Sequence, residues 1–169
     1  ADEFAVFLGA SYFRLVGQHQ SYGLSTRGLA INTASSQGEE FPAFREFWLV
    51  TPDSDAESVT LMALMDSPSL SGAYRFTLTP GEHTEAEIEA EIFARDDIEK
   101  VGIAPLTSMF TFGEASAQRP DDFRPQVHDS DGLLMHTGQG EWIWRPLSNP
   151  SAVRVSSFTD DAPQGFGLM

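Results

Sequence analysis

The stretch GLLMHTGQGEWIWR, residues 132–145, predicts a β-hairpin. Residues 132–136 and 141–145 are short runs rich in apolar side chains, and the loop between them reads Thr-Gly-Gln-Gly. Its two glycines allow the positive φ that a tight loop requires. We therefore expect the two runs to pair as antiparallel strands.

Further runs of strand length lie on both sides of this hairpin. Residues 59–65 and 73–78 are separated by Asp, Ser, Pro and Gly, and they predict a second antiparallel pair. Residues 44–50 alternate polar with apolar or small side chains, as a strand does. Residues 153–158 predict a further strand, and residues 165–169 predict the start of another.

Residues 87–94 allow two interpretations. A threonine three residues before Glu87 fits a helix capping box, and Glu and Ala favour helix. A period of two instead places Ile88, Ala90 and Ile92 on one face and the acidic residues on the other, whereas helical spacing would scatter them. We predict a half-exposed strand.

The composition predicts one folded all-β domain. The chain has 169 residues, 41% of them hydrophobic, with thirteen phenylalanines, and a chain of this length buries roughly 70% of its unfolded surface. Short strands separated by Gly and Pro, without a convincing long helix, predict an antiparallel β-sandwich. No internal repeat or linker indicates a second domain, so we expect residues 1–169 to form a single segment.

Charge and residue usage exclude several classes of function. The formal net charge of −15 disfavours nucleic acids and anionic lipid surfaces as partners. No apolar run reaches eighteen residues, so no membrane span is expected. There is no cysteine, and the four histidines lack the compact spacing of metal ligands. We expect neither a metal nor a cofactor.

His128, Asp129 and Asp131 lie just before the hairpin. In an extended segment residues two apart project to the same side, so the two carboxylates would share one face. Neighbouring carboxylates can raise one pKa and leave one group as a base, which suits glycoside hydrolysis. Alternatively, Asp-Ser-Asp-Gly is a turn whose side chains bond backbone amides. Spacing alone leaves both interpretations open.

Trp142 and Trp144 are also two residues apart and predict one aromatic face. An indole plane suits the apolar face of a sugar ring, but tryptophans on a hairpin more often fill a core. Arg145 beside them can hydrogen-bond sugar hydroxyls or pair with a surface acid. Both interpretations stay open for these three residues.

Six longer segments stand out along the chain: FLGASYFR (7–14), YGLSTRGLAI (22–31), GEEFP (38–42), GIAPLTSMF (102–110), VHDSDGL (127–133) and GEWIWRPL (140–147). Together they resemble one family, the periplasmic glucan biosynthesis proteins of the MdoG/OpgG and OpgD type. The segments occur in the family's order and at similar spacings, and the resemblance runs from about Phe7 to Met169.

The resemblance implies a protein of the Gram-negative periplasm that acts in making osmoregulated periplasmic glucans, whose backbone is β-1,2-linked glucose. It implies an antiparallel β-sandwich similar to galactose mutarotase, followed in the family by a small immunoglobulin-like domain. This chain looks like the middle of that sandwich only. We therefore expect its partners to be a β-1,2-glucan and the missing parts of its own full-length chain.

The family is similar to inverting β-1,2-glucan hydrolases, and the resemblance implies that Asp129 matches the general base. The corresponding general acid would lie beyond Met169. Since general acid help is typically worth about 10²–10⁴-fold, the segment alone should be close to inert. There are two alternatives to a hydrolase. The chain can be a non-catalytic glucan-binding or assembly module, or a piece without independent function. The candidate substrate-binding residues are His128, which can also orient Asp129, with Asp131, Trp142, Trp144, Arg145, Tyr12, Arg14 and Arg27.

Overall fold

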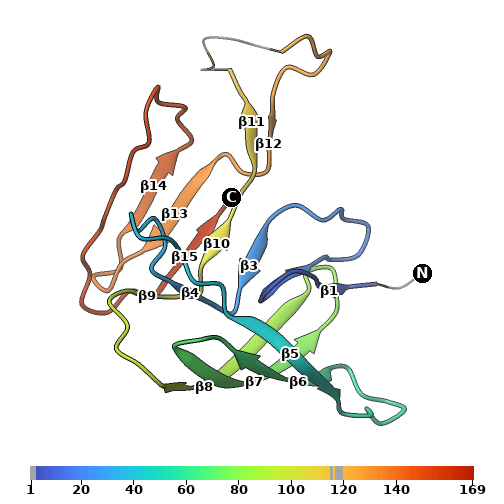
Figure 1. Ribbon diagram of the computed structural model, residues 1–169. Helices are drawn as coiled ribbons and strands as arrows, with labels where there is room; N and C mark the ends of the chain where they lie inside the picture. Colours follow the sequence, from blue (N-terminus) through green and yellow to red (C-terminus); the bar gives the residue numbers. More distant parts are fainter. Residues whose placement is uncertain (1–2, 115, 117–119) are drawn as a thin grey trace. The chain divides into compact units, whose positions relative to one another are not determined.

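A computed structural model describes residues 3–114, 116 and 120–169 (Figure 1). The described residues form strands and loops without a helix, which confirms the all-β prediction. Among them, accordingly, no helix is long and apolar enough to span a membrane. The chain divides into two compact units, residues 1–105 and 106–169. That both belong to one sandwich domain similar to galactose mutarotase stays a prediction.

The largest sheet of the first unit has four antiparallel strands in the order β5-β6-β7-β8 (Figure 1). The predicted antiparallel pair is β6 with β7, and its register runs from Val59 opposite Leu78 to Asp66 opposite Ser71. The strands span Ala43–Leu49 (β5), Val59–Asp66 (β6), Leu70–Thr79 (β7) and Glu85–Ala94 (β8).

Shorter strands complete the first unit. β1 (Ala5–Phe7), β2 (Tyr12–Leu15) and β3 (Ser25–Arg27) pair in that order. β4 (Leu29–Ile31) pairs with β9 (Val101–Ile103). All of these pairs are antiparallel.

The core of the first unit lies between the four-stranded sheet and the shorter strands. Every second residue of β7 from Leu70 to Leu78 is buried. Phe76 is fully buried, and its ring centroid lies 5.1 Å from that of Phe7 on β1 and 5.2 Å from that of Phe13 on β2. Aromatic contacts between two layers of strands are what a β-sandwich requires.

β8 is a strand, so the helical interpretation of this segment is wrong. Ile88 lies opposite Phe76, and Ile92 lies opposite Gly72, on the face of the sheet that β7 buries. The period of two therefore places the apolar residues correctly. Ile88 and Ile92 are nevertheless 43% and 39% exposed.

The second unit contains the predicted hairpin. β13 (Gly132–His136) pairs with β14 (Trp142–Pro146), and β15 (Gly165–Leu168) pairs with the other side of β13, as Figure 1 shows. The predicted strand at residues 165–169 is thus confirmed. The remaining strands are β10 (Leu106–Thr107), β11 (Phe110–Phe112) and β12 (Val127–His128), of which β11 and β12 pair with each other.

The predicted strand at residues 153–158 is wrong. The segment has no strand structure, and Val153 and Val155 are 96% and 78% exposed. Valine favours strands only where a neighbouring strand offers pairing and burial. Among the described residues, this segment pairs with neither of the outer strands of the sheet, β14 and β15, and its two valines gain little burial.

Candidate functional site

Asp129 lies in the bend between β12 and β13, and its side chain is exposed. Its Oδ2 accepts the N–H of Met109 at 3.1 Å, and its own N–H donates to the Met109 carbonyl at 2.9 Å. Within the described residues, no hydrogen bond joins the other oxygen, Oδ1, to the protein. The carboxylate is therefore oriented through one oxygen and available through the other.

His128 is turned toward Asp131. Its Nδ1 lies 3.0 Å from the Ser130 carbonyl oxygen and 3.6 Å from Asp131 Oδ1. The His128 side chain is only 9% exposed, and its ring stacks on that of Phe110 with centroids 6.0 Å apart. Both His128 and Asp131 line a cavity of about 230 Å³, whose other walls are Phe110, Gly113, Glu114, Gln126, Leu147 and Asn149.

The two aspartates do not lie on one strand face. Asp129 and Asp131 both stand in bends, so the extended segment on which that prediction rested is not formed. Asp131 lines the cavity beside His128, whereas Asp129 is not among the residues of its wall. The turn interpretation is half right, because Asp129 does bond a backbone amide, but that amide belongs to Met109, twenty residues earlier in the chain.

The tryptophans of the hairpin are exposed among the described residues and do not belong to the core there. Trp142 is 63% and Trp144 45% exposed. The ring of His136 stacks on that of Trp142 with centroids 4.2 Å apart and planes 2° from parallel. His136 was not predicted as a site residue, although the hairpin register, which sets it opposite Trp142, could have revealed it.

Trp144 lies across the neighbouring strand. A Cβ atom on Gly132 would come within 2.7 Å of the Trp144 ring atoms Cη2 and Cζ2, and within 2.4 Å of the Arg145 carbonyl oxygen. Only glycine leaves room for the indole at this position. The sequence therefore folds the second tryptophan flat against β13.

Arg145 lies on the opposite face of the hairpin from the tryptophans. It stands opposite Leu133, and its guanidinium carbon lies 5.2 Å from the ring centroid of Phe158. There it lines a cavity of about 740 Å³ together with Arg154 and Ser156. The structure thus separates Arg145 from Trp142 and Trp144, which the sequence had grouped.

Tyr12 and Arg27 belong to the first unit and contact each other. The Arg27 guanidinium carbon lies 5.4 Å from the Tyr12 ring centroid and 5.6 Å from that of Phe41. Arg27 is only 7% exposed, and its Nη1 pairs with Glu39 Oε1 at 2.6 Å. Its Nε is buried and has no hydrogen-bond partner among the described residues. Arg14, on β2, is half-buried opposite Val6.

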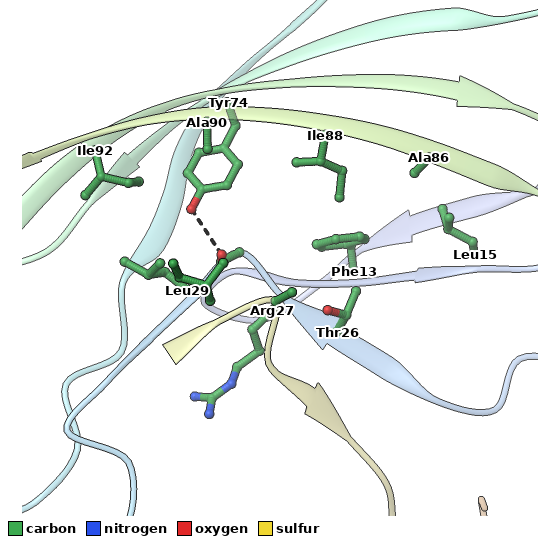
Figure 2. A pocket seen from close by; sticks show the side chains of 13 residues that line it. Phe13, Leu15, Thr26, Arg27, Leu29, Tyr74, Ala86, Ile88, Ala90 and Ile92 are labelled. Carbon is green, nitrogen blue, oxygen red and sulfur yellow. Dashed lines mark hydrogen bonds between the residues drawn. The ribbon is translucent and has the colours of Figure 1, made fainter. Parts of the chain in front are cut away.

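The first unit also holds an apolar cavity of about 480 Å³. Figure 2 shows Tyr74, Ile88 and Ile92 reaching into it from one sheet toward Phe13 and Leu29, while the Arg27 guanidinium points away. The Tyr74 hydroxyl donates to the Gly28 carbonyl at 3.0 Å, and burial raises the pKa of Tyr74 to about 12. Walls of this kind do not suit a polyhydroxylated ligand.

The whole chain, residues 1–169, matches the family described as periplasmic glucan biosynthesis protein, MdoG. It is similar to proteins named glucans biosynthesis protein G, with 58% identity in Vibrio cholerae serotype O1, 56% in Shewanella frigidimarina and 57% in Ralstonia nicotianae. Each match covers 168 residues and 99% of this chain, but only 31%, 30% and 33% of the respective relative. The chain thus spans about a third of the length of these relatives, and it belongs to the MdoG family of periplasmic glucan biosynthesis proteins.

Proposed function

We propose that this chain is part of a protein of the Gram-negative periplasm that processes glucans with a β-1,2-linked glucose backbone. Family membership supports the role in glucan biosynthesis and the compartment. The net charge of −15 is compatible with an uncharged polymer as ligand. The finer assignment, cleavage of the glucan, rests on the geometry of one carboxylate.

We infer that Asp129 is the general base of an inverting hydrolysis. The observation that carries this inference is the exposed carboxylate with Oδ2 fixed by the Met109 amide and Oδ1 without a hydrogen bond to the described residues. A fixed carboxylate with one available oxygen can hold a water and take its proton.

Besides Asp129, the reaction needs a general acid that protonates the leaving oxygen. The water oxygen bonds to the anomeric carbon as Asp129 takes its proton, and the glycosidic C–O bond breaks on the opposite face of the sugar. The leaving oxygen takes a proton from a general acid, which in inverting enzymes lies about 6.5–9.5 Å from the base. We expect that acid elsewhere in the whole protein.

The test is Asp129→Asn in the whole protein, with linear β-1,2-glucan as substrate. Asparagine keeps an oxygen for the Met109 amide but cannot take a proton, so we expect about 10²–10⁴-fold slower formation of new reducing ends. The melting temperature should stay unchanged, because the side chain keeps its size. Asp161→Asn, an exposed aspartate of the same unit, is the matched control and should cleave normally. Equal rates in the two variants would remove Asp129 from the mechanism.

The second candidate is a module that binds glucan without cleaving it. The exposed, ordered tryptophans of the hairpin favour this function, because they offer a sugar-binding surface that needs no catalytic group. Incubation of the whole protein with linear β-1,2-glucan separates the two candidates. Measurable binding without new reducing ends would support the module.

A further inference from the structure

Beyond the pair Gly132–Pro146, one face of the sheet β14-β13-β15 carries two rows of residues. Directly opposite residues of antiparallel strands project to the same side of a sheet. Each row therefore begins with a tryptophan on β14, crosses β13 and ends with a glycine on β15. We call this surface the Trp142 face; its rows are Trp142, His136 and Gly165, and Trp144, Leu134 and Gly167.

The first row contains an indole that is both exposed and held in place. Trp142 is 63% exposed, yet the His136 ring lies parallel to it at 4.2 Å between centroids. A side chain that is already ordered loses little rotamer freedom when a ligand binds to it. The free surface of this indole is therefore a preformed stacking surface.

Both rows end over open space. A Cβ atom added to Gly165 or to Gly167 would meet no atom within 4 Å, and neither glycine has a positive φ. Among the described residues, then, neither packing nor backbone conformation requires glycine at these positions, in contrast to Gly132 beneath Trp144. Glycine inside a strand weakens the strand and often marks a place where a ligand approaches the backbone closely.

The chemistry of the face selects an uncharged ligand. Its six residues include no carboxylate, ammonium or guanidinium group, and the chain's net charge of −15 repels anions. An indole offers an apolar plane for the C–H face of a pyranose, and its N–H can donate to a hydroxyl at the ring edge. Because the two glycines of β15 carry no side chains, the space above this strand can hold the pyranose ring.

We propose that the Trp142 face stacks one glucose unit of the glucan on the indole of Trp142, above the glycines of β15. This inference deepens the proposed function and rests on it for the identity of the polymer. It assigns His136 as the residue that positions the indole. It also predicts that Arg145, on the other side of the sheet, does not contact this glucose unit.

The experiment measures binding of a linear β-1,2-glucan oligosaccharide by calorimetry to the whole protein carrying Asp129→Asn. We expect Trp142→Ala to weaken binding about tenfold, since stacking is lost, and Trp142→Phe to retain most of the affinity. Gly167→Val should weaken binding about as much, because its Cβ atom meets no atom within 4 Å and its methyl groups would occupy the space above β15. The matched control is Trp48→Ala on β5, an indole that is 50% exposed, and it should bind normally.

Two results would overturn the proposal. One is affinity within about twofold of the parent for both Trp142→Ala and Gly167→Val, with unchanged melting temperatures. The other is protection of Trp142 from oxidation in the ligand-free whole protein, mapped by mass spectrometry, because another part of the protein would then cover the face. Continued cleavage by Asp129→Asn would instead refute only the catalytic role of Asp129, since the binding comparison among the Trp142 variants would still stand.

Discussion

We expect Glu40→Ala to loosen the turn between β6 and β7. Glu40 Oε1 accepts hydrogen bonds from the Ser67 hydroxyl, from the Ser69 N–H at 3.0 Å and from the Ser69 hydroxyl at 2.8 Å. Ser67 is 4% exposed, so water reaches it poorly. Alanine would leave three donors of one turn without their acceptor.

The size of the effect follows from these three donors. A buried donor left without a partner costs about 1–3 kcal/mol, but the two hydroxyls can rotate toward other acceptors. Arg95 also continues to hold the turn, because its Nη1 donates to the carbonyls of Ser67 at 2.5 Å and Leu70 at 3.1 Å. We therefore expect a loss of about 2–3 kcal/mol for Glu40→Ala and about 1 kcal/mol for Glu40→Gln, which keeps an acceptor but loses the charge.

The effect should depend on pH. Burial raises the pKa of Glu40, but the hydrogen bonds from Ser67 and Ser69 outweigh it and hold the pKa below its ordinary value of 4.5. The folded pKa is thus lower than the unfolded one, so this stabilisation is present above about pH 4.5 and is lost as the pH falls through the folded value. The difference between the wild type and Glu40→Gln should shrink in acid.

Amide hydrogen exchange in the whole protein measures this local stability. Peptides covering residues 59–79 should exchange faster in Glu40→Ala, whereas Glu57→Ala, in an exposed loop, should leave them unchanged. Equal exchange in the two variants would refute the role of Glu40. A gap between wild type and Glu40→Gln that is as wide at pH 3.5 as at pH 7 would refute the linkage.

Two further predictions concern the core of the first unit. Phe76→Ala should cost about 3–5 kcal/mol in urea unfolding, because Phe76 is fully buried among the rings of Phe7 and Phe13; a loss no larger than that of Phe123→Ala, a residue 98% exposed, would contradict this packing. Tyr74→Phe should cost about 1 kcal/mol by removing the bond to the Gly28 carbonyl. Since the folded pKa of Tyr74 is about 12 and the ordinary value is 10.0, the wild type should also lose stability between these values as the pH rises. Ultraviolet titration that shows every tyrosine of the folded protein ionising near pH 10 would exclude this burial.

Alternation of side chains was sufficient to predict much of the sheet structure. It placed Ile88 and Ile92 on the face that β7 buries. The glycines of the loop, a separate signal, identified the hairpin. The same reasoning failed at residues 153–158, because a valine-containing run forms a strand only where the tertiary structure brings it alongside another strand. The sequence of the segment itself does not contain this information, because it depends on strands that are distant in the chain.

The candidate site contains one residue whose orientation could be predicted from the sequence and one whose orientation could not. Arg145 follows Trp144 directly, so in a strand it must point to the opposite face, and the sequence alone could have separated the two residues. Asp129 is different, because its orientation depends on the amide of Met109, which is distant in sequence. No spacing rule for Asp-Ser-Asp would have found that bond.

The outward side of β8 has a consequence for solubility. Glu85, Glu87, Glu89 and Glu91 alternate along this strand, which is an edge of its four-stranded sheet, and all four are exposed. Glu89 faces a cation across the ladder, Arg75, at 3.7 Å. If two molecules aligned their β8 edges, rows of like charge would meet along the shared ladder, and such pairs destabilise a sheet. The four glutamates therefore oppose edge-to-edge association of two copies through β8, a strand whose other face is apolar.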